Sequence, residues 1–412
     1  MNIYAIIILV VILLEFIIDL VADALNIRSL KIRVPPDLEG IYDREAYRKS
    51  QEYTRINTRF SNITGTFQLV VLLLFWFLGG FNVLDQVVRS WGFSIAVSGV
   101  LYLGIILLAY SLLSLPFGIY STFIIEEQFG FNKTTPQTFA MDQLKSIGLG
   151  ILLGVPLILA LISLFEYAGT FAWIYCWVLV TIYSLVIEFI FPTWIMPLFN
   201  KFTPIEEGEL KTEIMDYAGS VKFPIKNVFV MDGSRRSTKS NAFFTGFGNN
   251  KRIALFDTFI AKHTVSVIVA VLAHEIGHYK KRHIPQGIII GILHTGVVLF
   301  LLSIFLRSQG LYDAFFMEQE SIYAGFLFFG LLYTPIELLL SIGMNKLSRK
   351  NEYEADNYAA TTVKQPQVMI DALKKLSSHN LSNLTPHPFY VFMHYSHPPL
   401  LQRINAIKKH IV

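Results

Sequence analysis

Seven long apolar runs constrain the fold of this chain more than any other feature. A bilayer core about 30 Å thick needs about 20 apolar residues in a helix that rises about 1.5 Å per residue. The runs that meet this requirement are about 3–24, 66–84, 95–124, 147–168, 170–198, 284–306 and 322–344. The chain is also only 16% charged, whereas soluble proteins carry about a quarter charged residues. We therefore predict an all-α membrane protein with seven transmembrane helices.

Lysine and arginine are distributed unevenly among the segments that connect these runs. Segments after odd-numbered runs hold 32 of the 34 Lys and Arg residues, and the other segments hold two. Positively charged connecting segments stay in the cytosol. The bias therefore predicts an external N-terminus and a cytosolic C-terminal region. It does not distinguish a plasma or inner membrane from the endoplasmic reticulum.

The runs divide the chain into four parts. Residues 1–198 would form five membrane helices, with a basic cytosolic segment at 25–65 that we expect to be a solvated loop or an interfacial helix. Residues 199–283 and 345–412 are polar enough to fold in the cytosol, and residues 284–344 would form two membrane helices between them. A pair of membrane helices returns the chain to the face that it left, so both polar segments can meet at one membrane surface.

Composition excludes several kinds of partner and site. The formal net charge of +4 is modest, so nucleic acid is not suggested as a partner. Cys176 is the single cysteine and lies inside an apolar run. The chain can therefore form neither an internal disulfide nor a cysteine metal cluster. Any metal would have to be held by histidines and carboxylates.

A helical segment at 265–281 carries the strongest chemical motif. His274 and His278 stand four residues apart, so both imidazoles lie on one helix face about 6 Å apart, close enough to share one tetrahedral ion. Glu275 is displaced round the helix, where it could act as general base on a water that zinc activates to a pKa of about 7. A metal-free pair of histidines on an amphipathic face is the alternative.

A second acidic segment could complete the metal site. Zinc hydrolases use three protein ligands and keep one position open. Residues 348–356 indicate the start of a helix just past the seventh run, with Glu352 and Asp356 on one face. We assign Glu352 as the third ligand, and Asp356 as the acceptor that fixes the tautomer of a liganding histidine. Glu354 is the competing carboxylate, about 200° round the helix, and a structural salt bridge is the alternative reading.

These segments resemble a known family. His274-Glu275-Ile276-Gly277-His278 and Asn351-Glu352-Tyr353-Glu354-Ala355-Asp356 are similar to the gluzincin pattern of the CAAX prenyl protease type 1 family. Further stretches that agree with that family lie at 126–133, 197–202, 255–258 and 395–399. The resemblance implies a zinc metalloendopeptidase with one Zn²⁺ per chain, and seven long helices around a water-filled chamber. Its partners would be membrane lipid and peptides or lipidated protein C-termini.

Two further groups take their roles from this resemblance. Patterns typical of short strands at 227–231, 240–246 and 252–256 predict a small sheet in the cytosolic domain. Asn241, Ala242 and Phe243 resemble the strand that pairs with an extended substrate, although an ordinary asparagine at a strand start is the alternative.

His397 and Arg403 would stabilise the oxyanion of the tetrahedral intermediate, a task that needs fixed positive donors. The remaining histidines lack a spacing typical of metal ligands; they are His263, His283, His379, His387, His394 and His410. The resemblance also implies polar residues within the membrane, and Glu15, Asp19, Glu188, His294 and Glu337 are present.

The predicted activity is hydrolysis of peptide bonds by a membrane-embedded endopeptidase, at the cytosolic face of the membrane. Under the resemblance, the enzyme would remove the C-terminal tripeptide of prenylated CAAX proteins or cleave short peptide tails. A general protease for membrane-protein quality control is the alternative within the same class. A metal-ion transporter is the alternative from another class, but transporters often contain repeated halves and we find no internal repeat.

Overall fold

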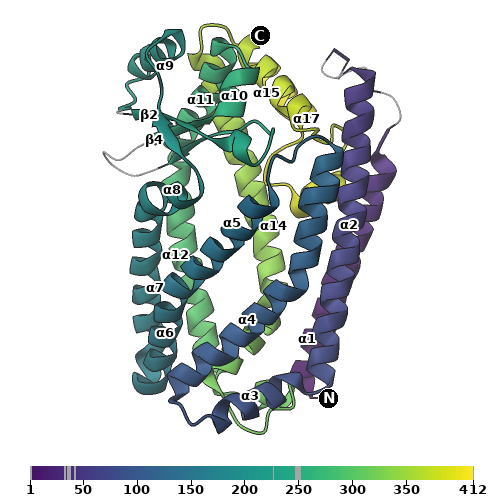
Figure 1. The fold of residues 1–412 in the computed structure, drawn as a ribbon, viewed down its shortest axis with the longest axis vertical. Helices are drawn as coiled ribbons and strands as arrows, with labels where there is room; N and C mark the ends of the chain where they lie inside the picture. Colours follow the sequence, from purple (N-terminus) through teal and green to yellow (C-terminus); the bar gives the residue numbers. More distant parts are fainter. Residues whose placement is uncertain are drawn as a thin grey trace.

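The computed structural model describes residues 2–31, 34, 39–40, 43–225, 227–245 and 252–411. Within these residues, seven helical segments are long and apolar enough to cross a membrane, which confirms the predicted number of spans. Figure 1 shows the long helices running along the long axis of the molecule. The sheet and several shorter helices gather at one end, where the C-terminus also lies, and the N-terminus is at the other end (Figure 1).

The first five candidate spans include several helices that are interrupted by π-helical or 3-10 turns. Their elements are α1 (Ile3–Ser29), α2 (Arg44–Phe77), α4 (Ile95–Tyr120), η2 (Ser121–Glu126), α5 (Pro136–Leu149), η3 (Gly150–Gly154), α6 (Val155–Tyr167), η4 (Gly169–Phe171), α7 (Ala172–Ile190), η5 (Phe191–Ile195) and α8 (Met196–Phe199). A short helix, α3 (Gly80–Ser90), lies between the second and third spans. The sixth and seventh spans and the short helix between them are α12 (His283–Phe305), α14 (Ile322–Thr362) and α13 (Gln309–Asp313).

The second span differs from the predicted run at 66–84. Asp43 caps α2 by accepting a hydrogen bond from the backbone N–H of Ala46 at 2.6 Å, and residues 44–64 contain neither proline nor glycine. The part of the predicted cytosolic segment from Arg44 onward is therefore helix, continuous with the span. Residues 32, 33, 35–38, 41 and 42 of that segment lie outside the described residues.

The same span ends earlier than expected. Gly79 has φ of 73°, in the left-handed region that glycine adopts without a steric cost. The chain turns there, and α3 begins at Gly80.

The seventh span does not end at residue 344 as predicted. α14 is a single helix of 41 residues that contains Pro335, and residues 345–362 contain no glycine or proline to break it. The expected new helix near residue 348 is therefore the continuation of the span. Because of this, Glu352 is carried on the same helix as the seventh membrane span.

A mixed four-stranded sheet lies beside the peptidase helices. Its strands are β1 (Phe202–Pro204), β2 (Asn227–Met231), β3 (Ala242–Thr245) and β4 (Arg252–Phe256), in the order β1-β2-β4-β3. β2 pairs in parallel with β4, and β1 and β3 pair antiparallel at the two edges. Three of these strands match the sequence prediction. Gly246 of the expected 240–246 strand lies outside the described residues, and β1 was not predicted.

The two polar segments share one hydrophobic core. The shorter helices there are α9 (Glu209–Ser220), α10 (Asp257–Lys262), α11 (Val265–Lys280), α15 (Gln367–His379), α16 (Pro388–His394) and α17 (Leu400–Ile411). Buried side chains of α9, α11, β4, α14, α15 and α17 pack together, among them Ile214, Leu255, Leu272, Ala359, Ile370 and Ile404. A second core lies among the membrane helices and contains Trp76, Phe315 and Phe328. The segments therefore meet at one end of the molecule.

Gly277 sets how closely α11 approaches α14. A Cβ atom at this position would lie 3.1 Å from both the Cα and the carbonyl oxygen of Ala355, and 3.3 Å from the Cβ of Tyr358. Only a residue without a side chain fits this crossing without displacing the neighbouring helix. The close approach brings the histidine face of α11 against the acidic face of α14.

Candidate metal centre and active site

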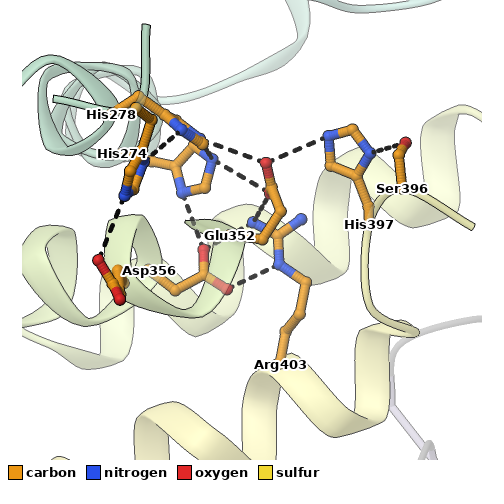
Figure 2. Close-up of polar contacts among 9 residues, drawn as sticks. His274, His278, Glu352, Asp356, Ser396, His397 and Arg403 are labelled. Atoms are coloured by element: carbon orange, nitrogen blue, oxygen red, sulfur yellow. Dashed lines mark hydrogen bonds and ion pairs between the residues drawn. The ribbon is translucent and has the colours of Figure 1, made fainter. Parts of the chain in front are cut away.

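Three side chains from two crossing helices converge on one point. The Nε2 atoms of His274 and His278, both on α11, are 3.1 Å apart. Glu352 Oε2 on α14 lies 3.4 Å from Nε2 of His274, and Glu352 Oε1 lies 3.2 Å from Nε2 of His278. His274 and Glu352 are buried, whereas His278 is half-buried. These three residues form a group whose ligand atoms could hold one metal ion, and Figure 2 shows them facing one another.

The spacing of these atoms fits a tetrahedral zinc ion. Zinc–ligand distances of about 2.0–2.1 Å give tetrahedron edges of about 3.3 Å, close to the three separations of 3.1, 3.4 and 3.2 Å. Oε2 of Glu352 is also buried, and the guanidinium of Arg403 lies 3.3 Å from it, so the carboxylate is held in its charged form, the form that binds a metal. Two imidazoles and one carboxylate are a ligand set that catalytic zinc sites use.

Asp356 lies behind the first histidine. Its Oδ1 atom is 2.9 Å from Nδ1 of His274, the ring nitrogen that faces away from Glu352. Arg403 on α17 holds the same carboxylate at two points, with Nε 2.7 Å from Oδ2 and Nη2 2.6 Å from Oδ1. Bidentate pairs of this kind are strong and fix orientation. α17 therefore orients Asp356, which in turn orients His274.

Glu275 lies beside the convergent group and is half-buried. Burial raises the pKa of its carboxyl above the ordinary value of glutamate; His274 and His278 oppose this effect, and Glu352 adds to it. A carboxylate whose pKa is moved toward neutrality is a better general base at neutral pH. Its position next to the metal ligands fits that chemistry.

His397 reaches the centre from the segment before α17. Its Nε2 atom lies 3.4 Å from Oε1 of Glu352, and its side chain is 63% exposed. Nδ1 of the ring is 3.0 Å from the hydroxyl of Ser396. Arg403 approaches the same carboxylate from the other direction, with Nη2 3.3 Å from Oε2 of Glu352. Figure 2 shows His397 on the side of Glu352 away from His274 and His278, whereas Arg403 reaches Glu352 and Asp356 together.

A cavity of about 710 Å³ adjoins the centre and contains Asn241, His397 and Arg403 among its lining residues. Asn241 comes directly before the edge strand β3, and its side-chain oxygen accepts a hydrogen bond from the N–H of Ala242 at 2.8 Å. Ala242 is buried, and the ring of Phe243 packs edge-on against Phe256. Among the described residues, β3 is the last strand on its side of the sheet, and Asn241, the residue before it, lines the same cavity as His397.

Glu354 does not join the convergent group. Its Oε2 atom instead lies 3.2 Å from Nε2 of His283, and Nδ1 of His283 is 3.0 Å from Nδ1 of His278. Sequence reasoning gave His283 no role because five residues separate it from His278, a spacing that is not typical of two ligands on one helix. The turn at Arg282, whose φ is 60°, brings the two histidines together.

Comparison with known proteins identifies the family. The model of peptidase family M48 matches residues 204–411, and the model of the CAAX prenyl protease N-terminal region, with five membrane helices, matches residues 23–201. The chain belongs to peptidase family M48. This M48 peptidase is therefore a multi-pass membrane metallopeptidase, and the mainly helical fold with a small sheet agrees with the sequence prediction.

Similar proteins span nearly the whole length of this M48 peptidase. CAAX prenyl protease 1 of Saccharomyces cerevisiae is 37% identical over 403 residues, which cover 91% of this chain and 88% of the yeast protein. The CAAX prenyl protease 1 homolog of Homo sapiens is 32% identical over 421 residues, with 91% and 88% covered. The crystal structure of S. mikatae Ste24p has a TM-score of 0.93 at 33% identity and covers 99% of each chain.

Proposed function

We propose that this M48 peptidase uses one zinc ion to remove the C-terminal tripeptide of prenylated CAAX proteins at the cytosolic face of its membrane. The observation that carries the proposal is the group of His274, His278 and Glu352, whose separations match the edges of a zinc tetrahedron. The names of the relatives, CAAX prenyl protease 1 and its homologs, indicate the class of substrate. The excess of Lys and Arg in segments after odd-numbered spans supports the cytosolic orientation.

Glu275 is the general base in this proposal. When bound, zinc would polarise the scissile carbonyl and lower the pKa of the attacking water to about 7. Glu275 takes the proton from that water and delivers it to the leaving amine. Its half-buried position beside the metal ligands suits a carboxylate that must exchange a proton near neutral pH.

In this proposal, His397 and Arg403 stabilise the oxyanion of the tetrahedral intermediate. The exposed ring of His397 lies at the cavity, 3.4 Å from Glu352, where it can donate a hydrogen bond to the oxyanion as negative charge develops. Arg403 is engaged by Asp356 at two points, so it contributes mainly fixed positive charge and the orientation of Asp356. Fixed donors at a developing oxyanion typically account for about 10²–10³-fold in rate.

The substrate would bind as a short extended segment. Within the part of the chain that the structure describes, the outer edge of β3 pairs with no other strand, so it can pair with an extended peptide through backbone hydrogen bonds. Asn241 precedes that edge and lines the cavity. The cavity of about 710 Å³ suits a few residues and not a folded domain. This favours terminal tails over internal loops of folded proteins.

The membrane would concentrate a lipidated tail at this site. α12 begins at His283, five residues after His278, so the metal group lies close to the end of a membrane span. Membrane affinity grows by about 0.8 kcal/mol per buried CH₂ of an attached chain. Two polar side chains also lie at membrane depth. His294 on α12 is half-exposed, Glu337 on α14 is exposed, and the two are 3.3 Å apart. Such groups are costly unless they are paired or wet, so their own pairing and a hydrated interior each account for them.

A competition assay tests this proposal. Detergent-solubilised protein is given a farnesylated CAAX peptide together with an equally hydrophobic acylated peptide whose terminal sequence is scrambled, and the products are identified by mass. Preferential release of the terminal tripeptide from the farnesylated peptide is expected, and the Glu275→Gln variant should release none above background. Equal cleavage of both peptides would instead indicate a general membrane-proximal peptidase, such as a quality-control enzyme.

A further inference from the structure

A chain of three side chains extends from the second histidine of the metal group. Nδ1 of His278 lies 3.0 Å from Nδ1 of His283, and Nε2 of His283 lies 3.2 Å from Oε2 of Glu354. His283 is 8% exposed. The chain starts on α11, passes through the first residue of α12, and ends on α14. It therefore joins three helices behind His278.

The turn between α11 and α12 creates this contact. α11 ends at Lys280, and Arg282 has φ of 60°, a left-handed conformation that residues other than glycine adopt in only a few per cent of cases. The reversal places the ring of His283 over that of His278, with ring centroids 5.1 Å apart and planes at 73°. The uncommon backbone conformation at Arg282 therefore sets the position of His283.

The direction of the hydrogen bonds follows from the metal group. A histidine that binds a metal through Nε2 keeps its proton on Nδ1, so Nδ1 of His278 must donate. His283 must then accept at Nδ1 and keep its own proton on Nε2, which donates to the carboxylate of Glu354. Every proton in the chain has one donor and one acceptor, and both imidazoles are neutral. An imidazolium at His283 would present a second N–H to His278 and break the chain.

In both histidines of the metal group, the second ring nitrogen thus faces a hydrogen-bond partner. His274 faces Asp356 directly at 2.9 Å, and His278 faces Glu354 through one intervening imidazole. Ligating histidines usually give their second ring N–H to an acceptor, which fixes the tautomer and raises the basicity of the ligand. Asp356 contacts His274 and Arg403, whereas Nδ1 of His278 faces His283.

We propose that His283 and Glu354 are positioning residues that hold His278 in the tautomer and orientation required for metal binding. The inference rests on the proposed zinc site. The competing explanation is that the pair merely fastens α12 to α14. The two explanations differ in what asparagine at position 283 should do. Its Oδ1 atom lies near the place of Nδ1 of histidine and can accept from His278, but its shorter side chain does not span the distance to Glu354.

The experiment measures metal affinity without substrate. Wild type, His283→Ala, His283→Asn and Glu354→Gln are stripped of metal and titrated with Zn²⁺ against a chromophoric chelator, and their Co²⁺ absorption bands are recorded. Lys350→Gln is the matched control, because Lys350 contacts the same carboxylate at 3.6 Å with a side chain that is 70% exposed. Melting temperatures of the metal-free proteins show how much the contact between α12 and α14 stabilises the fold.

The positioning role predicts a specific order of affinities. His283→Ala should bind zinc about 10–100-fold more weakly with a shifted Co²⁺ band, His283→Asn should recover most of that loss, and Glu354→Gln should lie between wild type and His283→Ala. Unchanged affinity in His283→Ala, or an Asn variant as weak as the Ala variant, would overturn the proposal. If wild type itself bound no zinc, the proposed function would fail, and that result is distinguishable from equal affinities in all proteins.

Discussion

Replacing Gly277 by alanine tests whether the close crossing of α11 and α14 sets the metal geometry. The new Cβ would lie 3.1 Å from two backbone atoms of Ala355, whereas ordinary contacts are 3.4–4 Å, so the helices must separate by a few tenths of an ångström. Overpacking of this kind costs about 1–3 kcal/mol, and alanine recovers about 1 kcal/mol through its helix propensity. The expected net destabilisation is therefore about 0–2 kcal/mol.

The same separation should be visible in metal binding. Glu352 lies one turn before Ala355 on α14 and supplies the carboxylate that His274 and His278 face, so moving the helices apart lengthens the ligand separations. If this net cost falls on the zinc-bound protein, zinc affinity should fall by up to about 30-fold, since about 1.4 kcal/mol corresponds to a factor of ten. The measurement is a Zn²⁺ titration against a chelator, together with the thermal midpoint with and without zinc.

Gly343→Ala is the matched control. This glycine lies on α14 as well, but a Cβ there meets no atom within 4 Å. The control should keep wild-type zinc affinity and gain slightly in stability from helix propensity. A Gly277→Ala variant with wild-type zinc affinity and raised stability would refute the argument that this crossing needs glycine.

Four further predictions concern the roles of single residues. Glu275→Gln should retain zinc and fold but lose at least about 10²-fold in turnover, as measured by peptide release alongside metal content. Glu352→Ala should lose most of its zinc, while Glu354→Ala should still bind one equivalent at saturating zinc. Equal zinc retention by the two variants would show that Glu352 is not the third ligand. His397→Ala should slow turnover by about 10²–10³-fold with unchanged zinc content. Lys375 is an exposed residue of α15. A cysteine introduced there should react with an impermeant reagent only after cells are permeabilised; labelling of intact cells would show that the predicted orientation is wrong.

Local spacing along one helix was enough to predict much of the site. His274 and His278 had to share a face because helix geometry places residues four apart side by side, and the structure brings their Nε2 atoms within 3.1 Å. The same reasoning placed Glu352 and Asp356 on one face of α14, and both contact His274. These inferences needed only the helical period and the ligand preferences of zinc.

Boundaries were predicted less well than the number of spans. Hydropathy detects where apolar residues stop, but a helix ends only where its backbone hydrogen bonds are interrupted. α2 therefore begins at the Asp43 cap, and α14 continues through polar residues to Thr362. β1 escaped prediction because three residues are too few to show an alternating pattern.

The sequence by itself determined the seven spans, the excess of positive charge in alternate segments, and the residues that can bind a metal, because each of these depends on composition or on spacing within one element. Tertiary structure alone decided which distant residues support them. Arg403 meets Asp356 across 47 positions of the chain, and Glu354 meets His283 across 71. Such contacts depend on how helices cross and how the chain turns at Arg282, and no period within a single helix encodes them.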